Sequence, residues 1–97
     1  MLQSAAPLFP VAGKEERPVY AALDLGTNNC RMLVASPVGS GFRIVDAFSR
    51  PTRLGEGLAQ TGVLSIDAME RTVEALQICV GRMTRAKVTK ARYITTE

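Results

Sequence analysis

Short apolar runs separated by turn-forming residues occupy the first half of the chain. The runs 19–23 and 30–36 contain neither glycine nor proline, which predicts two buried strands joined by a tight turn. After the turn-forming stretch 37–41, residues 42–50 alternate apolar and polar side chains and predict a third strand. Its alternation places one set of side chains on a common face: Phe42, Ile44, Asp46 and Phe48. The pattern predicts three consecutive antiparallel strands.

The second half of the chain changes to helical spacing. Residues 52–64 combine glycines with apolar residues and predict an ordered loop, and Ser65 is a good helix N-cap. Apolar positions then recur at intervals of three and four: Ile66, Met69, Val73, Leu76, Val80 and Met83. This predicts a helix over 65–85 whose apolar stripe packs on the sheet. Residues 91–95 predict a fourth strand, and a right-handed crossover makes it parallel to the first.

The N-terminal residues show no such pattern. Residues 1–18 mix Ala, Pro, Gly and charged residues without periodicity, which predicts a disordered leader before a domain spanning 19–97. Pro7 and Pro10 interrupt its apolar patch, and no basic segment precedes that patch, which argues against a signal peptide. No apolar run approaches the ~20 residues that span a bilayer. We therefore expect a cytoplasmic protein without a membrane partner.

Composition narrows the class of partner. The chain has 97 residues, of which 46% are hydrophobic and 22% charged, so it is long enough for one small domain and is not of disordered composition. The net charge of +3 comes with few aromatic residues: no Trp, two Tyr and three Phe. The basic residues gather late in the chain: Arg82, Arg85, Lys87, Lys90 and Arg92. Because no aromatic residues are interleaved with them as in a nucleic-acid site, these basic residues predict a solvated helix end.

Cysteine and histidine usage excludes two further classes of site. Cys30 and Cys79 match no zinc-ligand spacing, and the chain has no histidine. A Ser-His or Cys-His couple is therefore impossible within the chain. Cys30 is expected to be a small buried residue rather than a nucleophile.

The turn between the first two strands offers phosphate chemistry. Gly26 lets the backbone approach a ligand closely, so we expect its amide and the next two to be free to bind one anion. Thr27, Asn28 and Asn29 add short polar side chains. Asp24 is a hard oxygen ligand suited to Mg²⁺. The guanidinium group of Arg31 can pair with phosphate through two bonds. The plain alternative is an ordinary hairpin turn, since all these residue types are common in turns.

Two motifs carry a family resemblance. The stretch 24–31 resembles the first phosphate-binding loop of the actin, sugar kinase and Hsp70 ATPase superfamily. A second block, comprising 53–58, 62–65, Ala68 and Leu76, is similar to the exopolyphosphatase and guanosine pentaphosphate phosphohydrolase (Ppx/GppA) family. Sugar kinases and chaperones do not carry that block. The resemblance runs from about Tyr20 to the last residue, and it implies an α/β fold: a truncated ribonuclease H-like, actin-like ATPase half-domain of order βββαβ.

The resemblance also implies a reaction. The intact family member would remove terminal phosphate from polyphosphate or guanosine pentaphosphate as a homodimer, with Mg²⁺ or another divalent cation held by Asp24. Phosphate would be bound by residues of the turn and the strand after it: Gly26, Thr27, Asn28, Asn29 and Arg31. No catalytic residue is expected in this chain, because the family's general-base Glu is expected beyond Glu97.

The sequence allows two roles for Arg53. This residue could meet substrate phosphate, or it could pair with Glu56 or a neighbouring carboxylate and fix the loop, and the second interpretation is slightly favoured. Two other functions stay open for the whole chain. It could be a phosphate-binding or nucleotide-binding module without turnover, or an inactive fragment.

Overall fold

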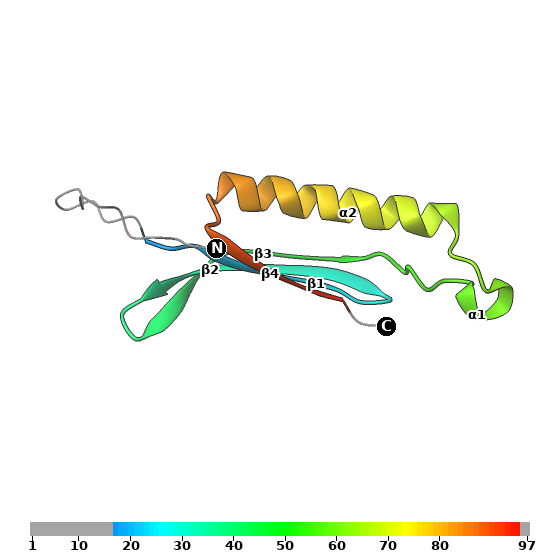
Figure 1. Ribbon diagram of the computed structural model, residues 1–97, viewed down its shortest axis with the longest axis horizontal. Coiled ribbons are helices and arrows are strands. Elements are labelled where there is room, and N and C mark those ends of the chain that lie inside the picture. Colours follow the sequence, from blue (N-terminus) through cyan, green and yellow to red (C-terminus); the bar gives the residue numbers. More distant parts are fainter. Residues whose placement is uncertain (1–16, 96–97) are drawn as a thin grey trace.

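The computed structural model describes residues 17–95, which form a four-stranded sheet with a long helix across one face (Figure 1). The elements in chain order are β1 (Tyr20–Leu25), β2 (Asn29–Val38), β3 (Gly41–Pro51), α1 (Leu58–Thr61), α2 (Ile66–Arg85) and β4 (Lys90–Thr95). The predicted βββαβ order is confirmed. The short α1 was not predicted. It lies between Gly57 and Gly62, whose left-handed backbones begin and end it.

The order of strands across the sheet is β3-β2-β1-β4. β1 and β2 are antiparallel neighbours, as are β2 and β3, and β4 runs parallel to β1 as predicted. Pairing of Leu25 with both Cys30 and Thr95 brings the end of β4 beside the turn that follows β1. The topology therefore puts the predicted phosphate loop at the end of the two central strands.

A β-bulge changes the predicted face of β3. Asp46 pairs with Val34 but Ile44 pairs with Ala35, so one extra residue, Val45, interrupts the alternation. Asp46 and Phe48 therefore share the face that α2 covers, whereas Phe42 and Ile44 are highly exposed. The prediction that all four side chains share one face is wrong, because strict alternation holds only for a strand without a bulge.

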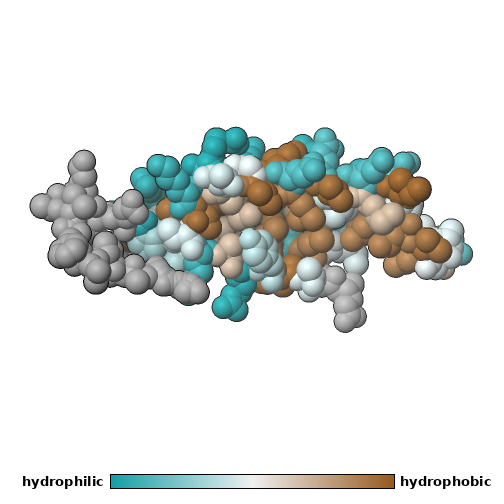
Figure 2. All heavy atoms as spheres, turned by 45° about the horizontal axis from the view of Figure 1, so that its top comes forward, coloured by the Kyte–Doolittle hydropathy of each residue, from teal (hydrophilic) through white to brown (hydrophobic). Residues whose placement is uncertain are grey.

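Helix α2 packs through a different stripe from the predicted one. Its buried residues are Ala68, Thr72, Ala75, Cys79 and Met83. Four members of the predicted stripe are exposed instead: Ile66, Met69, Val73 and Val80. Figure 2, which turns the α2 side toward the viewer, shows apolar side chains along this surface. Of the predicted face, only Met83 is buried and Leu76 packs partly against the core.

The size of the side chains explains the choice of stripe. Two neighbouring stripes of α2 have helical spacing, and the one with small residues faces the core residues of β1 and β2. Small side chains let the helix lie close to the sheet, where the interior is densely packed. Thr72 is tolerated there because its hydroxyl donates a hydrogen bond to the carbonyl of Ala68 at 2.8 Å. The capping prediction is confirmed, since the Ser65 hydroxyl accepts from the amide of Ala68 at 3.0 Å.

The C-terminal end of α2 is fastened to β3. Arg82 Nη1 lies 3.3 Å from Asp46 Oδ1, and its guanidinium carbon lies 4.9 Å from the centre of the Phe48 ring. Arg82 and Arg85 occupy the last turn, which confirms the interpretation of a basic helix end for these two. Lys90 and Arg92 lie on β4 instead, so the cluster is not a single helix end.

Two expectations concern the membrane and the leader. Within residues 17–95, no helix combines the length and apolar character needed to cross a membrane. The predicted leader falls outside the described residues except at its end, where the carbonyl of Pro18 accepts a hydrogen bond from Ser36 Oγ at 2.7 Å.

Candidate functional site

The turn 26–29 closes the β1–β2 hairpin directly after Leu25. Its backbone is fixed by a hydrogen bond from the amide of Gly26 to the carbonyl of Asn29 at 2.9 Å. The expectation that three successive amides are free is therefore wrong for Gly26, because the tight hairpin uses that amide to close itself. Within the described part of the chain, no hydrogen bond is formed by the amides of Thr27 and Asn28. These two amides are available for an anion.

The loop after β3 is bonded to this turn. The amides of Thr52 and Arg53 both donate to the carbonyl of Asn28, at 2.8 and 3.1 Å. The amide of Gly55 donates to the carbonyl of Thr27 at 3.1 Å. The two sequence motifs thus form one continuous structure, in which the turn's carbonyls face the loop.

An ion-pair cluster holds the same loop from the side of α2. Arg53 Nε lies 3.7 Å from Glu56 Oε2, so the predicted pairing of these two residues is found. Arg71 Nη2 lies 2.9 Å from the other oxygen of Glu56. The guanidinium group of Arg71 also donates to the carbonyls of Thr52 and Arg53, at 2.8 and 3.3 Å. Whether Arg53 meets phosphate stays a prediction.

Sequence reasoning missed Arg71. Its position carried a signal, because 71 lies three residues after Ala68 and four before Ala75, and therefore near the buried stripe of α2. An arginine there must find acceptors close to the sheet. The predicted stripe is offset from the buried one, so the sequence pattern does not place Arg71 beside the sheet.

Asp24 and Arg31 lie opposite one another on β1 and β2, on the face of the sheet away from α2. Together with Ser49 and neighbouring apolar residues they line a shallow hollow of about 520 Å³. Asp24 Oδ1 is buried and has no hydrogen-bond partner among the described residues. Arg31 is exposed. A carboxylate oxygen without a donor, next to a free guanidinium group, is suited to a cation and a phosphate together.

The donor set fits a weakly held hard cation. Residues 17–95 contain no group of three or more His, Cys, Asp or Glu that could enclose a metal ion. Mg²⁺ commonly takes one or two carboxylates and completes its shell with water and substrate phosphate. Asp24 alone can supply such a contact.

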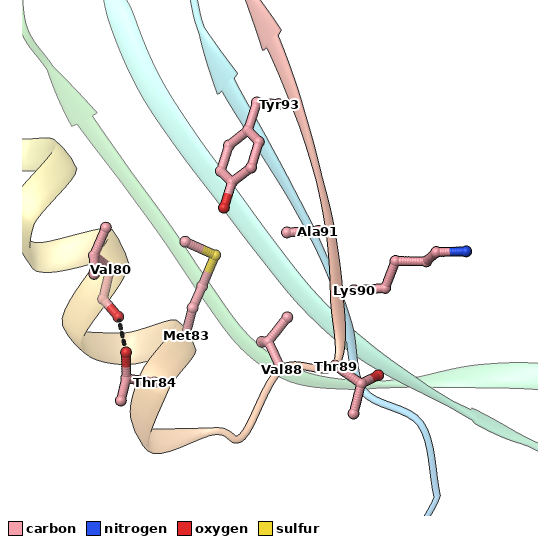
Figure 3. A pocket seen from close by; sticks show the side chains of 8 residues that line it. All are labelled: Val80, Met83, Thr84, Val88, Thr89, Lys90, Ala91 and Tyr93. Carbon is pink, nitrogen blue, oxygen red and sulfur yellow. Dashed lines mark hydrogen bonds between the residues drawn. The ribbon is translucent and has the colours of Figure 1, made fainter. Parts of the chain in front are cut away.

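A second hollow lies between the end of α2 and β4, and it is smaller, at about 320 Å³. Figure 3 shows the side chains of Met83 and Tyr93 pointing into it, with Val80, Val88 and Ala91 around them. Among the residues that the structure describes, its lining includes no carboxylate and no thiol, and Lys90 is its only charged residue. It offers no chemistry for phosphate transfer.

The cysteines are buried in the core between the sheet and α2. Cys30 and Cys79 are fully buried, as predicted for Cys30, and their sulfur atoms lie 3.9 Å apart. Burial and the neighbouring Cys30 raise the pKa of the Cys79 thiol to about 12. A thiol that stays protonated is a poor nucleophile, so neither geometry nor acidity favours a role for Cys79 in catalysis.

The model of the Ppx/GppA phosphatase family matches residues 33–97. Among curated proteins, the chain is 37% identical over 70 residues to a guanosine-5'-triphosphate,3'-diphosphate pyrophosphatase of Pseudoalteromonas translucida. It is 36% identical over 66 residues to a protein of the same name from Vibrio cholerae. These matches cover 72% and 68% of the chain but only 14% and 13% of the relatives. The chain thus spans about one seventh of their length.

Solved structures agree with the sequence matches. A Ppx/GppA family member from Aquifex aeolicus superposes with a TM-score of 0.79 at 26% identity, over 84% of this chain and 27% of that one. An exopolyphosphatase from Cytophaga hutchinsonii superposes with a TM-score of 0.72 at 19% identity. The second likeness concerns the fold alone. The four-stranded sheet with its long helix is therefore a fold shared with part of each of these larger chains.

Proposed function

Because the chain belongs to the Ppx/GppA phosphatase family, we propose that it carries the first phosphate-binding loop of a phosphoanhydride hydrolase. The reaction proposed for the whole protein is removal of the terminal phosphate of guanosine pentaphosphate, with inorganic polyphosphate as a second substrate. The names of the curated relatives support the guanosine substrate. The cytoplasmic location and the homodimer stay predictions.

The observation that carries this proposal is that Asp24 and Arg31 are cross-strand neighbours on β1 and β2, beside the turn. The amides of Thr27 and Asn28 are free to bind phosphate oxygens, and Arg31 adds positive charge on the open face. Asp24 Oδ1, to which no described residue donates a hydrogen bond, would hold a divalent cation. When bound, such a cation neutralises phosphate charge. The general base is proposed to come from a part of the enzyme outside this stretch.

Titration calorimetry tests this assignment by measuring the affinity of the chain for tripolyphosphate with and without Mg²⁺. In the wild type, Mg²⁺ should raise the affinity for tripolyphosphate. In Asp24→Asn this gain should be lost, because a neutral amide does not replace a carboxylate as a ligand of Mg²⁺. In Arg31→Gln, affinity should fall about 5- to 30-fold with or without Mg²⁺, since a charge-assisted bond is lost. Asp67→Asn and Arg85→Gln remove the same charges from exposed positions at the two ends of α2 and serve as controls. If the site variants match these controls, the turn is only a hairpin.

A second function is favoured for the chain by itself. Because the general base is proposed to come from outside this stretch, we propose that residues 17–95 bind phosphate without activating water. The purified chain should therefore bind tripolyphosphate without releasing phosphate from it. Turnover that follows the protein through purification, requires Mg²⁺ and is lost in Asp24→Asn would contradict this second function.

A further inference from the structure

We propose that Arg71 is a positioning residue, which keeps the loop 52–57 bonded to the phosphate turn and leaves the Arg53 guanidinium group only loosely paired, so that it can turn to an anion. The inference rests on the proposed function, because it assigns a role in phosphate binding to a residue outside the turn. Arg71 reaches the loop from the N-terminal third of α2, so the helix contributes to the geometry of the site.

The first step concerns the backbone of the loop. Arg71 donates to two successive carbonyls, those of Thr52 and Arg53, while the amides of the same two residues donate to the carbonyl of Asn28. The peptide units at the start of the loop are thus held from both sides. A planar guanidinium group can span several acceptors at once, which a single ammonium group cannot do.

The second step concerns the strained backbone of Arg53. Its φ of 48° lies in the left-handed region, which is unfavourable for a residue other than glycine. Its carbonyl accepts from both the amide of Glu56, at 3.0 Å, and Arg71. These bonds offset the strain and fix the direction in which the Arg53 side chain leaves the loop.

The third step concerns charge. Glu56 lies between two arginines, but its contact with Arg71 is 2.9 Å and that with Arg53 is 3.7 Å. The side chain of Arg71 is 29% exposed and that of Arg53 is 58% exposed. Two positive charges and one negative charge leave the cluster with a net charge of +1. Because Arg71 binds Glu56 more closely, the excess charge resides on the loosely held Arg53, which can turn to a phosphate.

Amide hydrogen exchange tests the docking of the loop directly, because the amides of Thr52, Arg53 and Gly55 are the donors to the turn. In Arg71→Gln, exchange at these three amides should become at least about tenfold faster relative to that of the sheet amides. Arg71→Lys keeps the charge but should restore little of the protection. Arg85→Gln removes the same charge from the far end of α2 and should leave these amides unchanged. Equal exchange in Arg71→Gln and Arg85→Gln would overturn the proposal.

Affinity for tripolyphosphate tests whether docking serves binding. Arg71→Gln should weaken the affinity about 5- to 30-fold relative to Arg85→Gln. In an Arg53→Gln background the same change should have little further effect, because Arg71 acts through Arg53. Additive losses, or no loss at all, would overturn the positioning role. If Arg71→Gln does not fold, Arg71→Lys replaces it in both measurements.

The two proposals fail in different ways. A wild-type chain that does not bind tripolyphosphate contradicts the proposed function, and the binding role of Arg71 falls with it. The exchange experiment needs no ligand and decides separately whether Arg71 docks the loop.

Discussion

The amide of Gly55 donates a hydrogen bond to the carbonyl of Thr27 at 3.1 Å, across two loops that are distant in the sequence. A methyl group at position 55 would come within 3.7 Å of Thr27 Cβ, so the two loops are in ordinary contact rather than crowded. The turn after β1 and the loop after β3 are therefore bonded into one structure.

The stripe of α2 that packs on the sheet can be tested with two truncations. Met83→Ala removes a buried side chain and should lower the free energy of unfolding by about 2–4 kcal/mol. Val73→Ala removes an exposed side chain of the predicted stripe and should change it by less than about 0.5 kcal/mol. Urea unfolding followed by circular dichroism measures both. Equal losses in the two variants would show that the helix is rotated relative to this structure.

Alkaline pH should destabilise the fold through Cys79. Burial raises the pKa of its thiol from 9.0 to about 12 in the folded chain. Between these values the unfolded chain loses the thiol proton while the folded chain keeps it, so stability falls as pH rises. The free energy of unfolding falls by at most about 1.4 kcal/mol per pH unit in this range. Below about pH 9 the thiol is protonated in both states, and the full stability is present. Urea unfolding of the wild type and Cys79→Ala between about pH 8 and 11 checks this, and parallel slopes would contradict it.

The N-cap of α2 should contribute measurable stability. Ser65→Ala removes the acceptor for the Ala68 amide, and the free energy of unfolding should fall by about 0.5–2 kcal/mol. Ser65→Asp supplies another acceptor and should retain most of the stability. Thermal unfolding compares the two. A loss of the same size in both variants would mean that the capping bond is not formed.

Two neighbouring glycines should differ in their tolerance of alanine. Gly57 has a φ of 78° at the start of α1, so Gly57→Ala should lower the free energy of unfolding by about 1 kcal/mol although the space is open. Gly55 is not among the described residues with positive φ, and its added methyl group meets only Thr27, so Gly55→Ala should be close to neutral. Thermal unfolding of the two variants gives the comparison. Greater destabilisation by Gly55→Ala would indicate tighter loop contact than the structure shows.

Local chemistry explains what could be predicted of the fold. Ser65 caps α2 because its hydroxyl accepts a hydrogen bond from an amide of the first helical turn, which has no acceptor within the helix. The predicted strands and their order follow from apolar runs bounded by turn residues. The bulge at Val45 was hidden, because an extra residue in one strand is defined only by its pairing with the neighbour. The buried stripe of α2 was hidden as well, because periodicity marks two adjacent stripes and only packing against the sheet selects one.

The sequence by itself determined the element order, the helix cap, the burial of Cys30 and the two motifs that mark the family, because each depends on residues that are close in the chain or on residue type. The tertiary structure decided which side of α2 is buried, that Gly26 closes its own turn, and that Asp24 Oδ1 has no donor within residues 17–95. It also decided that Arg71 joins the loop 52–57. These features depend on distances between residues far apart in the chain, and the close packing of a helix against a sheet is what sets them.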